Sequence, residues 1–175
     1  MAQRDPLENP EPLIRRVYSY VAYRIGDGAD AEDVTSATFE RALRYRHSYD
    51  EQRGDPARWL IGIASRCVSE FYAQRAEAGP EGPEGVAPGE LAAEAPGRID
   101  LQRAVATLSD RERELVALRF GADLTARQIA EVLGMRTNAV EVALHRLLGT
   151  LRETLGQDAP QRQGAPADRR VEAAE

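Results

Sequence analysis

The chain has 175 residues, of which 23 are basic and 29 acidic, giving a formal charge of −6. No stretch is long and apolar enough to span a bilayer and no N-terminal signal pattern is present, so we expect a cytoplasmic protein without membrane insertion. A single cysteine, Cys67, excludes an internal disulfide, and with His47 and His145 as the only histidines no zinc site is expected.

The acidic surplus lies mainly in one connecting stretch. Residues 77–98 carry one Arg against five Glu, whereas residues 1–76 carry 11 Arg against 12 acidic residues and residues 99–156 carry eight of each. The parts on either side of the stretch are therefore close to neutral. That balance permits contact with DNA but does not by itself indicate it, because nucleic-acid-binding domains are usually basic.

Three helices are predicted in the first part of the chain, after an N-terminus, 1–9, that we expect to be disordered. Apolar residues recur at helical spacing from Leu13 to Ile25. A second helix is predicted over residues 31–47, with Asp30 as its N-cap. A third helix begins at Pro56, because proline is favoured at the first helical position.

The third predicted helix has one broad apolar face. The residues on it are Trp59, Leu60, Ile63, Ala64, Cys67, Val68 and Phe71. We expect Trp59 and Cys67 to be core residues rather than a base-stacking platform and a reactive thiol. The next segment, 77–98, is rich in Gly, Pro, Ala and Glu and cannot bury enough apolar area to fold, so it is predicted to be a flexible linker.

The last part of the chain, 99–156, is predicted to be helical as well. Ser109 and Glu112 have the spacing of a capping box, which opens a helix that follows a first one over residues 101–108. The tail, 157–175, is rich in Gln, Pro and Ala and is expected to be disordered.

A helix-turn-helix is predicted over Leu124–Leu155. Thr125 and Gln128 form a second capping-box pattern, and Gly134 can end the first helix in the left-handed conformation. Thr137 or Asn138 is expected to cap the longer second helix. An ordinary antiparallel helical hairpin is the alternative, but the short turn and the small Ala130 opposite it favour the DNA-binding form.

The predicted fold class is therefore all-α. Two small helical domains, 10–76 and 99–156, are joined by the flexible linker 77–98. We do not expect an enzyme or a cofactor, because the sequence contains no nucleophile–base set, phosphate-binding loop or metal-ligand spacing.

Two sets of residues resemble one known family. The first set is Asp30-Ala31-Glu32-Asp33-Val34, Thr38-Phe39 with Arg41-Ala42, and Trp59-Leu60 followed by Ile63-Ala64. The second is Leu108-Ser109 with Arg111-Glu112-Arg113-Glu114, Leu118-Arg119-Phe120, Gln128-Ile129-Ala130-Glu131-Val132-Leu133-Gly134, Ala139-Val140 and Leu144-His145-Arg146. With both sets in this order, the chain resembles the extracytoplasmic-function (ECF) group of bacterial sigma-70 RNA polymerase sigma factors, with region 2 before region 4.

The resemblance implies a transcription initiation factor that binds the clamp and flap of core RNA polymerase and opens promoter DNA. The residues implied in polymerase binding are Glu32, Asp33, Ser36, Phe39, Glu40, Arg41 and Arg44. Those implied at the −10 element are His47, Tyr49, Gln52, Arg53, Arg58 and Arg66, and those at the −35 element are Arg136, Thr137, Asn138, Glu141, His145 and Arg146. An anti-sigma factor is a further implied partner.

The recognition helix departs from the usual family pattern. Where the family often has Thr-Val-Lys-Ser-Arg, this chain has Ala139 to Ala143, so that a Lys and an Arg are replaced by Glu141 and Ala143. The departure keeps two alternatives open: a sigma-like regulator that acts mainly through protein contacts, and a stand-alone LuxR-like helix-turn-helix regulator. The second alternative leaves residues 11–76 without a role.

Overall fold

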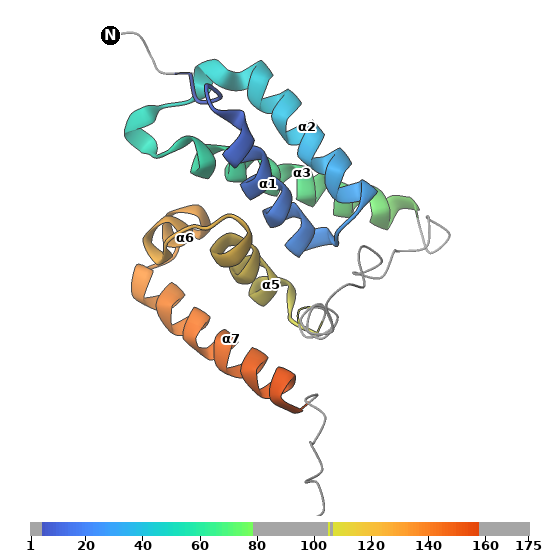
Figure 1. The fold of residues 1–175 in the computed structure, drawn as a ribbon, viewed down its shortest axis with the longest axis vertical. Helices are drawn as coiled ribbons and strands as arrows, with labels where there is room; N and C mark the ends of the chain where they lie inside the picture. Colours follow the sequence, from blue (N-terminus) through green and yellow to red (C-terminus); the bar gives the residue numbers. More distant parts are fainter. Residues whose placement is uncertain (1–4, 79–104, 106, 158–175) are drawn as a thin grey trace, which may run out of the picture.

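The computed structural model describes residues 5–78, 105 and 107–157 (Figure 1). Every regular element in these ranges is a helix, which confirms the all-α prediction. The predicted linker and tail lie outside the described residues, except for 77–78 and 157. Most of the helix predicted over 101–108 lies outside them as well.

The first half of the molecule consists of α1 (Pro10–Ile25), α2 (Ala29–Tyr45) and α3 (Pro56–Ala78), which pack against one another (Figure 1). The buried side of α2 is formed by small and β-branched residues at helical spacing, Ala31, Val34, Thr35, Thr38 and Ala42. Small side chains at these positions let α1 and α3 approach closely.

The structure tests the predictions made for the residues that precede α3, α2 and α1. Asp55 caps α3 as proline placement suggested, since its Oδ1 accepts a hydrogen bond from the Arg58 amide at 2.8 Å. The predicted cap Asp30 is wrong, because α2 begins at Ala29 and its cap position is Gly28. Residues 5–9 form a turn in which Asp5 accepts the Leu7 amide at 3.0 Å and Pro6 is buried, unlike the disorder predicted there.

The second half consists of α5 (Asp110–Val116), η3 (Ala117–Gly121), α6 (Ala126–Leu133) and α7 (Thr137–Gln157). Both predicted capping boxes are present, Ser109 with Glu112 at α5 and Thr125 with Gln128 at α6. Gly134 ends α6 at φ 63° and ψ 33°, in the left-handed region that glycine adopts without steric cost.

η3 is a π-helical turn that ends the α5 segment. The Ala122 amide donates to the Ala117 carbonyl, five residues back, at 2.8 Å. The turn is followed by Asp123 at φ 52°, a left-handed residue that is not glycine. The wider turn directs Gly121 and Ala122 toward α1, where both are buried.

One hydrophobic core runs through both halves. Val17, Tyr20 and Val21 of α1 belong to the same buried cluster as Leu118 and Leu124 of the second half. Gly121 lies directly against α1, and a Cβ at this position would meet the Tyr20 backbone nitrogen at 2.8 Å. The two predicted helical units therefore pack on each other, an arrangement that the sequence pattern of two units on a tether did not predict.

Candidate functional site

All the residues predicted to read the −35 element lie on the outward face of α7 or, in the case of Arg136, directly before the helix. Each of them is exposed: Arg136, Thr137, Asn138, Glu141, His145 and Arg146. The inward face is formed by residues one helical turn apart, Val140, Leu144, Leu147 and Leu151, all of them buried. The polar face is thus presented to solvent along the first three turns of the helix.

The turn between α6 and α7 fixes the direction of this face. The Met135 amide donates to the Ala130 carbonyl at 2.8 Å, and the buried Ala130 leaves room for the crossing of the two helices. α7 begins at Thr137, and the Val140 amide donates to the Arg136 carbonyl at 3.2 Å, so both Thr137 and Asn138 lie inside the first turn and both alternatives predicted for the cap are wrong. The Asn138 amide is consequently not used as the helix cap.

The residues predicted at the −10 element fall into different environments. His47 and Gln52 are exposed in the segment before α3, which contains the short 3-10 helices η1 (Arg46–Ser48) and η2 (Glu51–Arg53), and Arg66 is exposed on α3. Arg58, on the first turn of α3, forms an ion pair with Glu131 of α6 at 2.7 Å. The structure therefore places Arg58 at the boundary between the halves and leaves His47, Gln52 and Arg66 on the surface.

Tyr49 has a packing role that its sequence context did not reveal. Its side chain is only 4% exposed, its ring meets Trp59 edge-on with centroids 5.6 Å apart, and its hydroxyl donates to the Gly54 carbonyl at 3.1 Å. Tyr49 thus anchors the loop to α3 instead of presenting its ring to a base. The partly buried Trp59 is a core residue as expected.

The polar face of α2 carries the residues predicted to bind polymerase. Glu32, Asp33, Ser36, Glu40 and Arg44 are exposed along it. Two predicted members differ from these: Phe39 is half-buried against the core, and Arg41 forms a two-point ion pair with Glu70 of α3, one of whose contacts measures 2.7 Å.

The pair between Arg41 and Glu70 crosses a hollow between α2 and α3. The hydrogen bond from Arg41 holds the pKa of the Glu70 carboxyl below its ordinary value. The hollow has a volume of about 290 Å³ and is lined by Asp30, Asp33, Glu70, Arg41, Phe71 and Cys67, among others. Three carboxylates against one guanidinium give this hollow an acidic character.

Sequence reasoning missed two large apolar residues at the end of α2. The side chains of Leu43 and Tyr45 are 57% and 55% exposed, close to the predicted −10 loop. The available signal was helical spacing, because Leu43 falls on the same side of α2 as Ser36 and Glu40.

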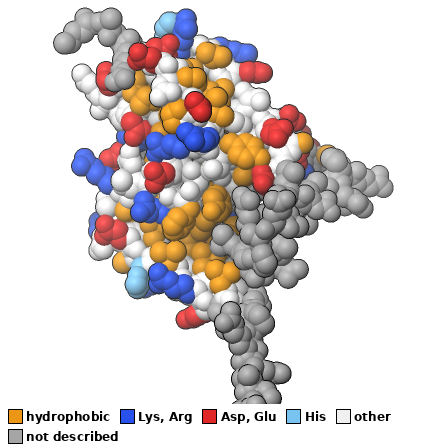
Figure 2. All heavy atoms as spheres, viewed as in Figure 1, with side chains coloured by type: hydrophobic (Ala, Val, Ile, Leu, Met, Phe, Trp, Pro, Cys, Tyr) orange, Lys and Arg blue, Asp and Glu red, His pale blue; other side chains and the backbone are white. Residues whose placement is uncertain are grey.

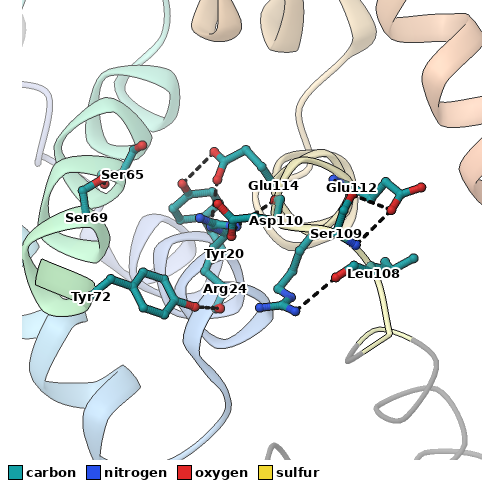
Figure 3. Close-up of polar contacts among 11 residues, drawn as sticks. Tyr20, Arg24, Ser65, Ser69, Tyr72, Leu108, Ser109, Asp110, Glu112 and Glu114 are labelled. Carbon is teal, nitrogen blue, oxygen red and sulfur yellow. Dashed lines mark hydrogen bonds and ion pairs between the residues drawn. The ribbon is translucent and has the colours of Figure 1, made fainter. Parts of the chain in front are cut away.

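The boundary between the halves carries a polar cluster that sequence reasoning also missed (Figure 3). Arg24 of α1 is 9% exposed in its side chain; its Nη1 contacts Asp110 Oδ1 at 3.0 Å, and its Nε lies 2.8 Å from Glu114 Oε2. The Tyr20 hydroxyl donates to Glu114 Oε1 at 2.9 Å. Arg16 donates to the carbonyls of Ala122 and Asp123, at 2.7 and 3.1 Å.

These contacts shift the titration of the groups involved. Burial, and after it the charge of Glu114, raise the pKa of the Tyr20 phenol well above its ordinary value. Burial disfavours the charged form of Arg24, but the carboxylates of Glu114 and Asp110 outweigh it and raise the pKa of the guanidinium. Arg24 therefore stays charged, and within the described part of the chain the two carboxylates paired with it, those of Asp110 and Glu114, belong to the other half.

The face of the molecule drawn in Figure 2 is of mixed charge. Figure 2 shows Arg side chains interspersed with Asp and Glu over the face in view, with no extended field of one sign. Within the described part of the chain, no cluster of three or more His, Cys, Asp or Glu has an arrangement that could hold a metal ion. None of the helices in that part combines the length and the hydropathy that crossing a bilayer requires.

Comparison with known proteins gives a consistent result for both halves. Residues 11–77 match the model of sigma-70 region 2, and residues 98–151 match that of sigma-70 region 4. The chain is 33% identical over 159 residues to the ECF RNA polymerase sigma factor BldN of Streptomyces coelicolor; the match takes in 82% of this chain and 57% of BldN.

A second relative and one solved structure agree with this result. The chain is 32% identical over 176 residues to the ECF RNA polymerase sigma factor SigD of Mycobacterium tuberculosis, with 88% of this chain and 77% of SigD covered. A structure of the sigma factor RpoE in complex with the anti-sigma factor NepR from Bartonella quintana has a similar fold, with a TM-score of 0.62 at 19% identity over 85% of this chain and 94% of that one. The chain thus belongs to the ECF group of the sigma-70 family of RNA polymerase sigma factors.

Proposed function

We propose that the chain binds core RNA polymerase, recognises the −10 and −35 promoter elements and promotes DNA opening, acting in the cytoplasm. The observation that carries the proposal is the exposed polar face of α7, which follows directly from the left-handed turn at Gly134. A helix presented in this way after a short turn has the geometry with which helix-turn-helix proteins enter the major groove.

The residues of this face offer specific base contacts at the −35 element. The Asn138 amide matches the donor and acceptor pattern of adenine, and the Glu141 carboxylate can accept a hydrogen bond from the amino group of cytosine. Arg136 and Arg146, at either end of the face, are suited to phosphates or to guanine. The proposed −35 site therefore combines a few base contacts with few phosphate charges.

The exposed polar face of α2 would dock on the polymerase. Glu32, Ser36, Glu40 and Arg44 lie on it in one row at a spacing of four residues, with Asp33 beside the row. His47, Gln52 and Arg66, with the exposed Leu43 and Tyr45, would meet the opened −10 element, since unstacked bases need both polar contacts and apolar surfaces. In this proposal the polymerase supplies all the catalysis and the chain supplies recognition.

Run-off transcription tests the assignment of α7. Core polymerase mixed with the full chain and GC-rich genomic fragments should give specific transcripts. Asn138→Ala should reduce them by about tenfold, because one good side-chain–base contact is worth about 1–3 kcal/mol. Thr150→Ala, about 18 Å further along the same helix, is the matched control and should have no effect. Equal activity of both variants would remove Asn138 from the site.

A sigma-like regulator that acts mainly through protein contacts is the second candidate. It is favoured by Glu141, whose negative charge on the outward face of α7 repels phosphates. The two candidates differ in the footprint that the full chain with core polymerase leaves on promoter DNA. Protection of the −35 element supports the first, and protection confined to the −10 element supports the second.

An anti-sigma factor is the further partner we propose. The support is the likeness to the sigma factor RpoE, which is seen in complex with the anti-sigma factor NepR. Such a regulator would compete with core polymerase for the exposed face of α2. A binding protein that fails to displace the chain from core polymerase would not fit this role.

A further inference from the structure

Val142 is a large apolar side chain on the outward face of α7, among the polar residues proposed to meet DNA. It is 41% exposed, whereas every other Val and Leu of this helix is buried or half-buried. Single exposed apolar residues are common on protein surfaces and do not by themselves indicate a function. What distinguishes Val142 is the direction in which its side chain lies.

Val142 lies opposite the buried side of α7. Successive residues of a helix are rotated by about 100°, and Val142 is two positions from both Val140 and Leu144, so it lies about 160° from each of these buried residues. Glu141, by contrast, lies only about 60° from Leu144. Val142 therefore occupies the centre of the outward face, and Glu141 lies at its edge.

The neighbours of Val142 on this face leave it accessible. Asn138 lies one turn before it, and His145 and Arg146 lie one turn after it, all of them exposed and polar. Gly149 follows two turns after it and has no side chain, and a Cβ at that position would meet nothing within 4 Å. The line through Asn138, Val142 and Gly149 is thus low along the helix. The edge of a base pair can approach the methyl groups of Val142 without meeting a longer side chain on that line.

The methyl groups of Val142 match one feature of the major groove, the C5 methyl group of thymine. Contact between this group and a valine removes apolar surface of both from water, which is favourable. A purine presents the acceptor N7 in the groove, and a valine placed against it would bury that atom without a hydrogen bond, which is unfavourable. Cytosine has no methyl group to bury. A valine at the centre of a helix face in the major groove therefore favours thymine.

We propose that Val142 is a specificity-determining residue that reads the C5 methyl group of a thymine in the −35 element. This inference rests on the proposed function, because that function places α7 in the major groove. Val142 is four residues from Asn138, which is about 6 Å along the helix axis and corresponds to about two base pairs. The thymine should therefore lie, on either strand, about two base pairs from the adenine that Asn138 is suited to read.

Replacement of thymine by deoxyuridine tests this contact, because it removes the C5 methyl group and keeps every hydrogen-bonding group of the base. Promoters are first identified by run-off transcription with the full chain and core polymerase. Each thymine of the −35 element, on both strands, is then replaced singly. We expect one replacement to weaken promoter binding by the complex of chain and polymerase about fourfold, which is the effect of one buried methyl-sized group.

Val142→Ala shows which side chain makes the contact. This variant should bind the unmodified promoter more weakly by at least the same factor, and it should be insensitive to the deoxyuridine that affects the parent chain. Ile14→Ala truncates a similarly exposed apolar residue of α1 and is the matched control, which should keep the full deoxyuridine effect. Asn138→Ala should keep it as well, because Asn138 is suited to another base. Circular dichroism should show that every variant retains its helical content.

The outcomes separate this inference from the proposed function. Specific transcripts from promoters in which no −35 thymine methyl group affects binding would overturn the inference alone. So would a deoxyuridine effect of equal size in the parent chain and in Val142→Ala. If Val142→Ala loses affinity for core polymerase without DNA, Val142 contacts protein and the inference is wrong. Absence of specific transcripts with the parent chain contradicts the proposed function, and the inference fails with it.

Discussion

We use the word seam for the contacts between α1 and the α5–η3 segment, which hold the two halves together. Replacement of Arg24 by methionine gives a quantitative test of how much these contacts stabilise the chain. Arg24→Met keeps most of the side-chain volume but removes the charge from a position where the side chain is 9% exposed. Two acidic residues of α5 lose their partner. Because Asp110 is largely exposed and Glu114 is mostly buried, the cost falls mainly on Glu114.

The expected cost can be estimated from the surroundings of Glu114. Removal of one partner from a buried ion pair typically costs about 3–5 kcal/mol, because the remaining charge stays desolvated. The Tyr20 hydroxyl still donates to Glu114 at 2.9 Å, which favours the lower end of that range, and the exposed Asp110 adds at most about 1 kcal/mol. We expect a loss of about 3 kcal/mol, which lowers the melting temperature by about 6–12 °C in a chain of this size.

Urea unfolding of the full chain measures this loss with two probes. Fluorescence of Trp59, the only tryptophan, reports on the first half, whereas circular dichroism reports on the helices of both. The transitions should coincide in the parent chain and separate in Arg24→Met. Arg66→Met, at an exposed position on α3, is the matched control. A loss below about 1 kcal/mol for Arg24→Met would show that the buried pair does not hold the halves together.

Three further predictions concern the cap, the pH dependence and the DNA-facing charge. Thr125→Ala should cost about 1 kcal/mol of unfolding free energy through loss of the α6 capping box, while the mid-helix Thr150→Ala should be nearly neutral; equal effects would contradict the capping role. Tyr20 faces Glu114, Arg24 and Ser65, and the pKa of its phenol is raised. The contribution of Tyr20 to the free energy of unfolding is therefore complete at pH values below the ordinary phenol pKa of 10.0 and is lost as the pH rises above it. Energy transfer between dyes attached to the two halves should therefore fall in alkali in the parent chain, and it should fall less in Tyr20→Phe. Identical pH profiles of energy transfer in the two chains would exclude Tyr20 as the titrating group. Glu141→Lys should raise DNA affinity and steepen its salt dependence by about one unit of slope, and an unchanged slope would place Glu141 away from the phosphates.

Local sequence signals were sufficient for most of the helices. Each capping box, at Ser109 and at Thr125, involves residues only three positions apart, and the end of α6 at Gly134 is equally local. Such signals can be recognised in the sequence, and all three are present in the structure. Helical spacing likewise separated the inner and outer faces of α2 and α7, and nearly all the residues predicted there to contact polymerase or DNA are exposed. Predictions of this kind hold because their physical cause is local.

The seam could not be predicted because its contacts join residues far apart in the chain. Arg24 and Asp110 are 86 positions apart, and Arg24 alone is indistinguishable from a cation that stabilises the end of α1. Gly121 resembles an ordinary helix-ending glycine until the backbone of Tyr20 is seen against it. Arg58 was predicted to lie at the −10 element, and its ion pair with Glu131 becomes visible only when α6 is seen packed near α3.

Tyr49 illustrates the opposite error. An aromatic residue in a polar loop before a helix has the composition of a base-stacking site, yet its ring is packed on Trp59 ten residues later. The loop turns back through η2 and Gly54, which has φ 142°, a conformation that no capping or periodicity rule anticipates. Exposure of a loop residue thus depends on the path of the whole loop.

The role proposed for the chain is that of the promoter-reading subunit of an RNA polymerase. Co-elution of the purified full chain with core polymerase, followed by mapping of transcript start sites on genomic DNA, tests it most directly. We predict a stable complex and transcripts that begin at defined positions downstream of shared −10 and −35 sequences. Absence of the complex, or transcripts whose starts are the same with and without the chain, would contradict the claim.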